Sequence, residues 1–134
     1  MTQKDKELLL KDICARLPYG VIIHVNGHDE RVDEINPFEG IITCGFQSFS
    51  IDECKPYLRP MSSMTLEEHR DWMKYCKADY DCEFQPEPTF DFESCILSIN
   101  WLNKNHFDYN NLIEKSLVNE VTKENNLYKE ENKL

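Results

Sequence analysis

The sequence predicts an α+β fold built as one domain. Apolar residues recur at helical spacing near the N-terminus and again in the C-terminal half, while residues 21–50 hold short β-branched runs separated by turn signals. We expect these strands to form a small antiparallel β-meander packed against the N-terminal and C-terminal helices. The competing architecture is a mostly helical domain with a detached hairpin.

The first helix is predicted over residues 3–17. Large aliphatic residues recur every four positions on one face, at Leu9, Ile13 and Leu17. The residues expected to face water are Lys6, Glu7, Lys11 and Asp12. Pro18 and Gly20 end the helix.

The strands are predicted next, over residues 21–25, 30–35, 41–44 and 46–49. Asn26-Gly27 is a strong signal for a tight turn after the first strand. His24 lies on that strand and His28 lies in the turn. No third ligand lies near these two imidazoles in the sequence, so we expect no metal site there.

Two capping boxes predict helices in the middle of the chain. Ser50 and Glu53 have the spacing that begins a helix of one or two turns. Thr65 and Glu68 have the same spacing and begin a helix that runs to about Cys76.

Arg59 lies between these two helices, in a crossing segment flanked by prolines. Its guanidinium is a candidate for anion recognition. The favoured interpretation is an arginine that pairs with one of the chain's 25 acidic residues or bonds helix-end carbonyls.

The C-terminal half is predicted to hold two further helices. The first ends near Lys104-Asn105 and buries a broad apolar face that includes Cys95, Ile96, Ile99, Trp101 and Leu102. Asp108 is expected to cap the second, which is short and carries Leu112 and Ile113. The domain is expected to span residues 1–121, and a polar tail over residues 122–134 is expected to fray.

His106 lies at the junction of these two helices. It is a candidate catalytic base, but the sequence places no nucleophile beside it, and an imidazole that bonds a helix-end carbonyl is the favoured interpretation. A pocket between the sheet and the C-terminal helices would be lined by four polar residues, Arg59, His106, Asp108 and Tyr109.

Residues 79–93 form an acidic segment with six carboxylates and no lysine or arginine. Aromatic residues alternate with the acids, so one interpretation is a surface that steers a basic partner. The other is a solvated loop held to the domain by its aromatics. The candidate contact residues are Asp79, Tyr80, Asp81, Glu83 and Phe84. The segment lacks the glycine and the closing glutamate of a calcium loop, so no metal is expected.

The composition disfavours several classes of protein. The formal net charge is −10, whereas nucleic acids and anionic membranes are bound by clustered lysine and arginine. Neither a membrane-spanning run nor a secretory signal is present, so we expect a cytoplasmic protein whose six cysteines are thiols. Zinc spacing and phosphate-binding glycine loops are also missing, so no cofactor is expected.

Three blocks of sequence carry a resemblance to a known group of proteins. They are the CARLPYGV block at residues 14–21, the KPYLRPMSSMT block at residues 55–65, and a C-terminal block with WLN at 101–103, HFDY at 106–109 and LIEK at 112–115. In this order they resemble small uncharacterised proteins of Bacteroides-type phages and mobile elements. Those proteins usually have Arg-Gly where this chain has Asn110-Asn111. The resemblance implies no catalytic residues.

This resemblance and the acidic balance favour a non-enzymatic accessory protein of a phage or mobile element. It would act by protein–protein contact in the bacterial cytoplasm, for example as an inhibitor of a host or defence protein. Its partner would be a protein, a basic one if charge guides the contact, and a homo-oligomer is also open. The alternative is a small enzyme or small-molecule binder that uses the pocket lined by the four polar residues.

Overall fold

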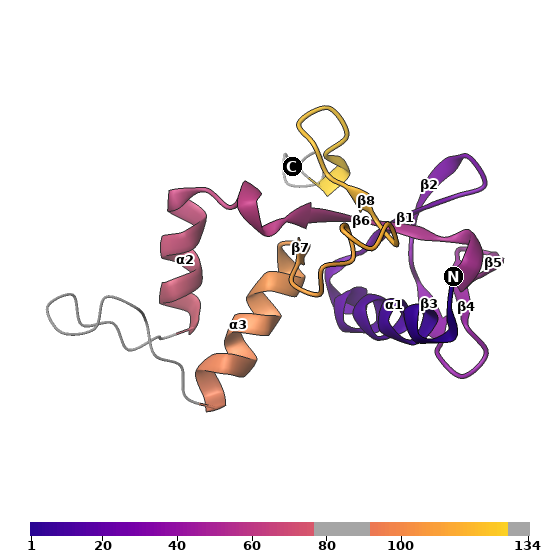
Figure 1. The fold of residues 1–134 in the computed structure, drawn as a ribbon, viewed down its shortest axis with the longest axis horizontal. Helices are drawn as coiled ribbons and strands as arrows, with labels where there is room; N and C mark the ends of the chain where they lie inside the picture. The colour runs from indigo at the N-terminus through magenta and orange to yellow at the C-terminus, as the bar shows by residue number, and fades with distance from the viewer. Residues whose placement is uncertain (77–91, 129–134) are drawn as a thin grey trace, which may run out of the picture.

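The computed structural model describes residues 1–76 and 92–128 (Figure 1). Its helices are α1 (Gln3–Arg16), α2 (Leu66–Cys76) and α3 (Phe92–Lys104), with three 3-10 turns, η1 (Leu17–Tyr19), η2 (Ile51–Glu53) and η3 (Met61–Ser63). Its strands are β1 (Ile22–Val25), β2 (His28–Arg31), β3 (Glu34–Asn36), β4 (Ile41–Cys44), β5 (Gln47–Ser50), β6 (Lys55–Pro60), β7 (Phe107–Asp108) and β8 (Asn119–Glu120).

The strands form two sheets. The larger has the order β2-β1-β6-β7, with β8 also paired to β6, and the smaller is the antiparallel meander β3-β4-β5. Strand β6 pairs antiparallel with β1 but parallel with β7 and β8. The α+β class is therefore confirmed, while β6, β7 and β8 were not predicted. Strand β6 was missed because its two prolines argue against a strand inside a sheet. Strand β7 was missed because two residues are too few to show a periodic pattern.

The predicted strand over residues 30–35 is split between the two sheets. The chain leaves β2 at Arg31 and enters β3 at Glu34. The Val32 N–H donates to the carbonyl of Val21 in one sheet, and the Asp33 N–H donates to the carbonyl of Thr43 in the other. This two-residue step is where the chain changes sheets, which a continuous strand could not do.

Local signals placed α1 and the short turns correctly. Thr2 and Asp5 form a capping box at the start of α1, and the chain leaves the helix through η1. The boxes at Ser50 and Thr65 are both formed by their predicted partners. Their hydrogen bonds use only residues three apart, so sequence spacing is enough to predict them.

The main core lies between α1 and the two sheets. Its fully buried residues come from α1, β1, β4, β6 and the segment after β7, and they include Leu9, Ile13, Val21, Ile23, Ile42, Leu58 and Leu112. Burying one such side chain contributes about 1.5–3 kcal/mol. The predicted helical face of α1 and the inward faces of the strands thus meet as expected.

A second, aromatic core joins α3 to β7 and α2. The ring of Trp101 stacks between Trp72 and Phe107, at centroid distances of 6.1 and 5.8 Å. The predicted burial of the rest of α3 is wrong, because Ile99 is 40% exposed and Cys95 and Ile96 are also exposed. The reason is visible in Figure 1, where α3 lies beside α2 and only its C-terminal end reaches the sheet.

The short helix predicted after Asp108 is wrong. Asp108 does accept the hydrogen bonds of a cap, from the N–H groups of Asn110, Leu112 and Ile113. The chain then forms a turn rather than a helix, because Asn111 and Ser116 adopt left-handed backbone angles, with φ of 56° and 61°.

The expected fraying of the tail does not extend to Tyr128. Its side chain is buried, and its hydroxyl donates to the carbonyl of Tyr57 at 2.8 Å and accepts from the N–H of Ile22 at 3.0 Å. These bonds hold residues 121–128 against β1 and β6. The sequence did not predict this contact, because a single tyrosine in a polar stretch forms no periodic pattern.

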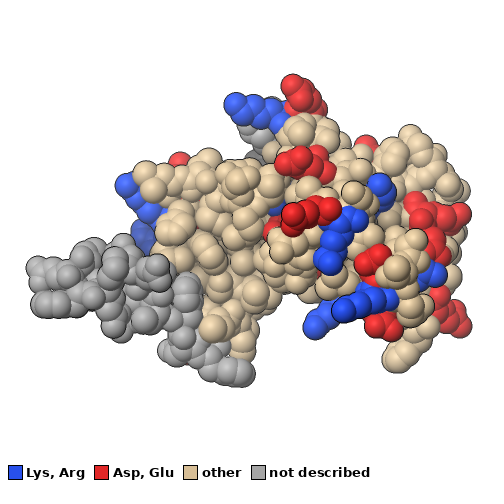
Figure 2. Space-filling view, in the orientation of Figure 1, with Lys and Arg blue, Asp and Glu red and all other residues tan. Residues whose placement is uncertain are grey.

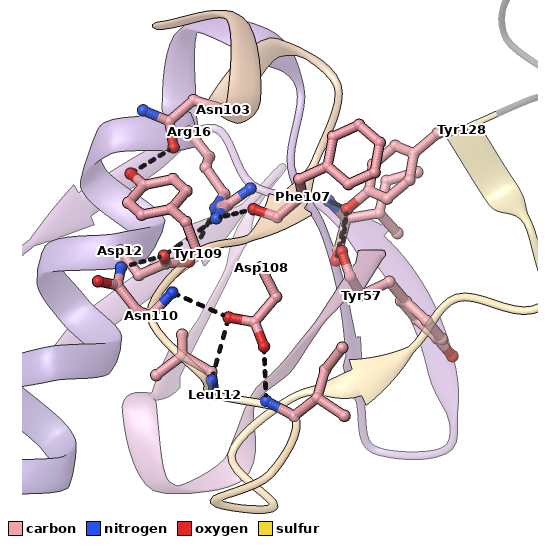
Figure 3. Close-up of polar contacts among 12 residues, drawn as sticks. Asp12, Arg16, Tyr57, Asn103, Phe107, Asp108, Tyr109, Asn110, Leu112 and Tyr128 are labelled. Carbon is pink, nitrogen blue, oxygen red and sulfur yellow. Dashed lines mark hydrogen bonds and ion pairs between the residues drawn. The ribbon is translucent and has the colours of Figure 1, made fainter. Parts of the chain in front are cut away.

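A buried ion pair ties α1 to β7 (Figure 3). Arg16 is fully buried and its Nε and Nη2 donate to Asp12 at 2.8 and 3.2 Å. Nη2 also donates to the carbonyl of Phe107, and the Asn110 amide donates to Asp12 at 2.9 Å. The predicted exposure of Asp12 is wrong, because a partner four residues along the helix compensates its charge inside the protein.

The variant Asp12→Ala should lose about 3–5 kcal/mol of the free energy of unfolding, because it leaves the Arg16 guanidinium buried without its counter-charge. Chemical denaturation measures this loss. Lys6→Ala, which breaks the exposed pair of α1 with Asp52, is the matched control and should cost less than about 1 kcal/mol. Equal losses in the two variants would show that the buried pair does not hold the fold.

Candidate functional site

A cleft of about 1000 Å³ lies where four walls from separate parts of the chain meet and Arg31 of β2 completes the lining. One wall is the corner at residues 18–20, and a second is the end of β6 with the start of α2. The third is the C-terminal end of α3 at residues 104–106, and the fourth is the segment at residues 120–128. The hydrogen bonds of Tyr128 keep that fourth wall in place.

The lining of the cleft is basic, whereas the chain as a whole is acidic. Among the described residues that line the cleft, four are lysine or arginine and two are acidic, although the chain has 15 basic and 25 acidic residues in all. The basic residues are Arg31, Arg59, Lys104 and Lys123, and the acidic ones are Glu68 and Glu120. Since the walls of a cleft focus the field of the charges that line it, this concavity favours anions.

Arg31 reaches the cleft by passing over Gly20. A Cβ atom added at Gly20 would lie 2.5 Å from Nη1 of Arg31, so the guanidinium lies directly on the glycine backbone. Gly20 also has a left-handed φ of 74° at the end of η1. Gly20 therefore has two roles. It adopts the left-handed backbone of the turn, and its lack of a side chain leaves room for the Arg31 guanidinium.

Arg59 is held by a carboxylate and an aromatic ring. Its guanidinium donates to both oxygens of Glu68, at 2.6 and 2.8 Å, and lies 4.1 Å from the ring centre of Phe107. The hydrogen bond from Arg59 lowers the pKa of Glu68. The interpretation of Arg59 as an arginine paired with an acid is thus confirmed, and much of its charge is neutralised.

His106 forms part of the cleft's lining and is buried (relative exposure 6%). Its ring stacks on Tyr128 at 3.5 Å, and its Nδ1 has no hydrogen-bond partner among the described residues. Burial lowers its pKa to about 3, and the positive charges of Arg16, Arg31 and Arg59 add to this shift. The imidazole is therefore neutral at pH 7.

The expected bond from the His106 imidazole to a helix-end carbonyl is wrong. The main chain makes that bond instead, from the His106 N–H to the carbonyl of Asn103. The backbone there is left-handed, with φ of 61°, and this turns the ring away from the helix end toward Tyr128.

Asp108 and Tyr109 lie outside the cleft lining. Figure 3 shows the polar contacts that they make instead. The Asp108 carboxylate accepts hydrogen bonds from backbone N–H groups, and the Tyr109 hydroxyl donates to the side-chain oxygen of Asn103 at 2.7 Å. The guanidinium of Arg16 lies 5.1 Å from the Tyr109 ring. Of the four residues predicted to line one pocket, the structure brings only Arg59 and His106 together there.

The other candidate residues, Asp79, Tyr80, Asp81, Glu83 and Phe84, lie outside the described residues. Sequence reasoning missed Arg31, Lys104 and Lys123. These side chains come from three distant segments, and a basic residue on a strand end or helix end has no pattern that distinguishes it from a solvated one.

The described part of the chain also bears on metal binding, membrane crossing and thiol chemistry. Within residues 1–76 and 92–128, no group of three or more His, Cys, Asp or Glu side chains is arranged to hold a metal ion. In these ranges no helix has the length and apolar character needed to cross a membrane. The cysteines at 14, 44, 54, 76 and 95 are free thiols.

Comparisons with protein-family models, with curated proteins and with solved structures each gave no match. The resemblance to phage and mobile-element proteins therefore stays a prediction. A function for this chain has to be inferred from the geometry of its cleft.

Folding stability should fall as the pH is lowered from about 6.5 to 3, in part because of His106. The unfolded chain binds a proton at this imidazole in that window and the folded protein does not, so the stability is complete above pH 6.5. One such group contributes at most about 1.4 kcal/mol per pH unit. Denaturation of the wild type and of His106→Asn across this range measures the effect, since asparagine tolerates the left-handed backbone.

The His106→Asn variant should lose less stability than the wild type as the pH falls. Tyr128→Phe is the matched control, because it removes the hydroxyl bonds but keeps a ring over the imidazole, so the variant should be less stable with an unchanged pH slope. Parallel profiles for the wild type and His106→Asn would contradict the burial of a neutral imidazole.

Proposed function

We propose that this chain is a binding protein and that its cleft receives the anionic part of a ligand. The observation that carries the proposal is the concentration of basic side chains in one concavity of a protein with a net charge of −10. A random distribution of charge would place mostly carboxylates there.

Three of the basic side chains come from different parts of the fold. Arg31, Lys104 and Lys123 come from the end of β2, the end of α3 and the segment after β8. A ligand that contacts all three would bridge walls from different parts of the chain. The side-chain amide of Asn105 in the same lining donates one N–H to the carbonyl of Trp101 and has a second N–H that can bond an anionic oxygen.

The state of His106 favours binding over catalysis in this cleft. A general base works best when its pKa lies near the working pH, and the pKa of His106 is about 3. Its ring is packed on Tyr128, so it acts as part of the wall.

The size of the cleft sets the class of ligand. A volume of about 1000 Å³ is at the upper end of the range for small-molecule sites. It suits a compact ligand with several anionic oxygens, either a small polyanion or the carboxylate side chains of an acidic protein segment. The second source would agree with the protein-contact function expected from the sequence.

The proposal can be tested by calorimetry at low salt, which measures the binding of pyrophosphate, citrate and a hexaglutamate peptide. The triple variant Arg31→Gln, Lys104→Gln, Lys123→Gln should bind the best probe at least about tenfold more weakly, since hydrogen bonds to charged groups contribute roughly 1.5–3 kcal/mol each. Added salt should also weaken binding. Preference for the peptide over the small anions would identify a protein ligand.

The control is Lys4→Gln, Lys11→Gln, Lys74→Gln, which changes the net charge equally at exposed positions of α1 and α2 outside the cleft lining. It should keep wild-type affinity to within about threefold, because distant exposed charges are screened. Equal losses in both triple variants, or no binding of any probe by the wild type, would remove the proposal.

Gly20→Ala offers a test that leaves the charge unchanged. The new Cβ would clash with the Arg31 guanidinium and strain a left-handed residue, at a cost of about 1–2 kcal/mol in stability. Because Arg31 must move, anion affinity should fall while the fold is kept. Gly27→Ala, at an equally left-handed glycine with open space around it, should cost similar stability and leave anion affinity as in the wild type.

A further inference from the structure

The meander β3-β4-β5 carries an aromatic residue at each of its two hairpin tips. Phe38 lies in the turn between β3 and β4 and is 98% exposed, and Phe46 lies in the turn between β4 and β5 and is fully exposed. Fully exposed phenylalanine is uncommon, because each ring leaves a large apolar area in water.

Neither turn needs its phenylalanine. In the first, the Asn36 side chain accepts hydrogen bonds from the N–H groups of Phe38 and Glu39, and Gly40 supplies the left-handed backbone. In the second, Gly45 is left-handed and its N–H donates to the carboxylate of Asp33. Other residues thus set the backbone of both turns, so the fold does not account for the two phenylalanines.

The surroundings of the two rings are acidic. Residues 32–54 contain five carboxylates and neither lysine nor arginine. Asp52 is paired with Lys6 of α1, whereas Glu34 and Glu39 make no ion pair within the part of the chain that the structure describes. Figure 2 shows acidic side chains at the end of the molecule where Figure 1 places β4 and β5.

The outward face of the meander is a short polar floor between the rings. The register places Glu34 beside Thr43 and Thr43 beside Ser48, and the last two side chains are hydrogen-bonded at 3.1 Å. The rings lie beyond opposite ends of β4, whose four residues span roughly 13 Å at 3.3 Å each. The meander therefore carries a short polar strip with an exposed phenylalanine in the turn at each end of β4.

We propose that this face of the meander, with Phe38 and Phe46 as anchors, docks onto a basic surface of another protein. The rings supply contact area, and the carboxylates around them attract positive charge. A second copy of the chain is the wrong occupant, because it would bring the same carboxylates face to face. None of the meander residues lines the cleft, so the two sites are independent.

An arginine-rich peptide that carries two leucines is the probe, and the same peptide with glutamine at each arginine is its control. Titration of the isotopically labelled protein, followed by NMR, should shift the amide signals of residues 34–50. The arginine peptide should bind more tightly than the glutamine peptide, and added salt should reduce this difference. Phe38→Ser with Phe46→Ser should weaken binding at least about tenfold.

Two controls separate this surface from the others. Leu66→Ser with Ile96→Ser removes two exposed apolar residues from the helices, and it should leave the peptide affinity unchanged. The triple variant of the cleft should also keep the peptide affinity, so failure here and failure of the anion cleft can be told apart. The Phe38→Ser, Phe46→Ser protein should melt as the wild type does, since neither ring packs in the fold.

Four outcomes would overturn the proposal. They are no binding of the arginine peptide, equal affinity for both peptides, equal affinity in the phenylalanine variant, and shifted signals outside residues 34–50. Self-association that disappears in the phenylalanine variant would identify a second copy as the occupant and would also reject a basic partner.

Discussion

The buried pair of Asp12 and Arg16 is the constraint on which the rest of the structure depends. It joins a turn of α1 to a segment 91 residues later, through the carbonyl of Phe107 and the amide of Asn110. Neither charge can be buried alone at a tolerable cost, so α1 and β7 must dock together. Once β7 is fixed, the ring of Phe107 stacks against Trp101, and the guanidinium of Arg59 lies over the ring of Phe107.

The same pair reaches the chemistry of the cleft. Burial is the main cause of the lowered pKa of His106, and the positive charges of Arg16, Arg31 and Arg59 add to it. A neutral ring adds no charge of its own to the wall of the cleft. In the proposed function, the imidazole supports the wall and the basic side chains of the lining supply the charge.

Features set by neighbours in sequence could be predicted, and features set by distant contacts could not. The capping boxes, the end of α1 and the meander follow from residues a few positions apart. The burial of Asp12, the exposure of Ile99 and the docking of Tyr128 depend on which segments meet in space. For the cleft, Arg59 was predicted from its proline-flanked segment and His106 from its place at the end of a helix, but the other basic residues of the lining could be located only once the fold was known.

The pairing of β6 has a consequence for synthesis on the ribosome. This strand has its antiparallel partner β1 already made, but both parallel partners, β7 and β8, follow about fifty or more residues later. Long-range parallel pairing forms slowly and leaves strand edges open until it is complete. A nascent chain would therefore carry one unpaired edge of its central strand while the next fifty or so residues are added. During that interval the edge of β6 would be open to chaperones that shield unpaired strands.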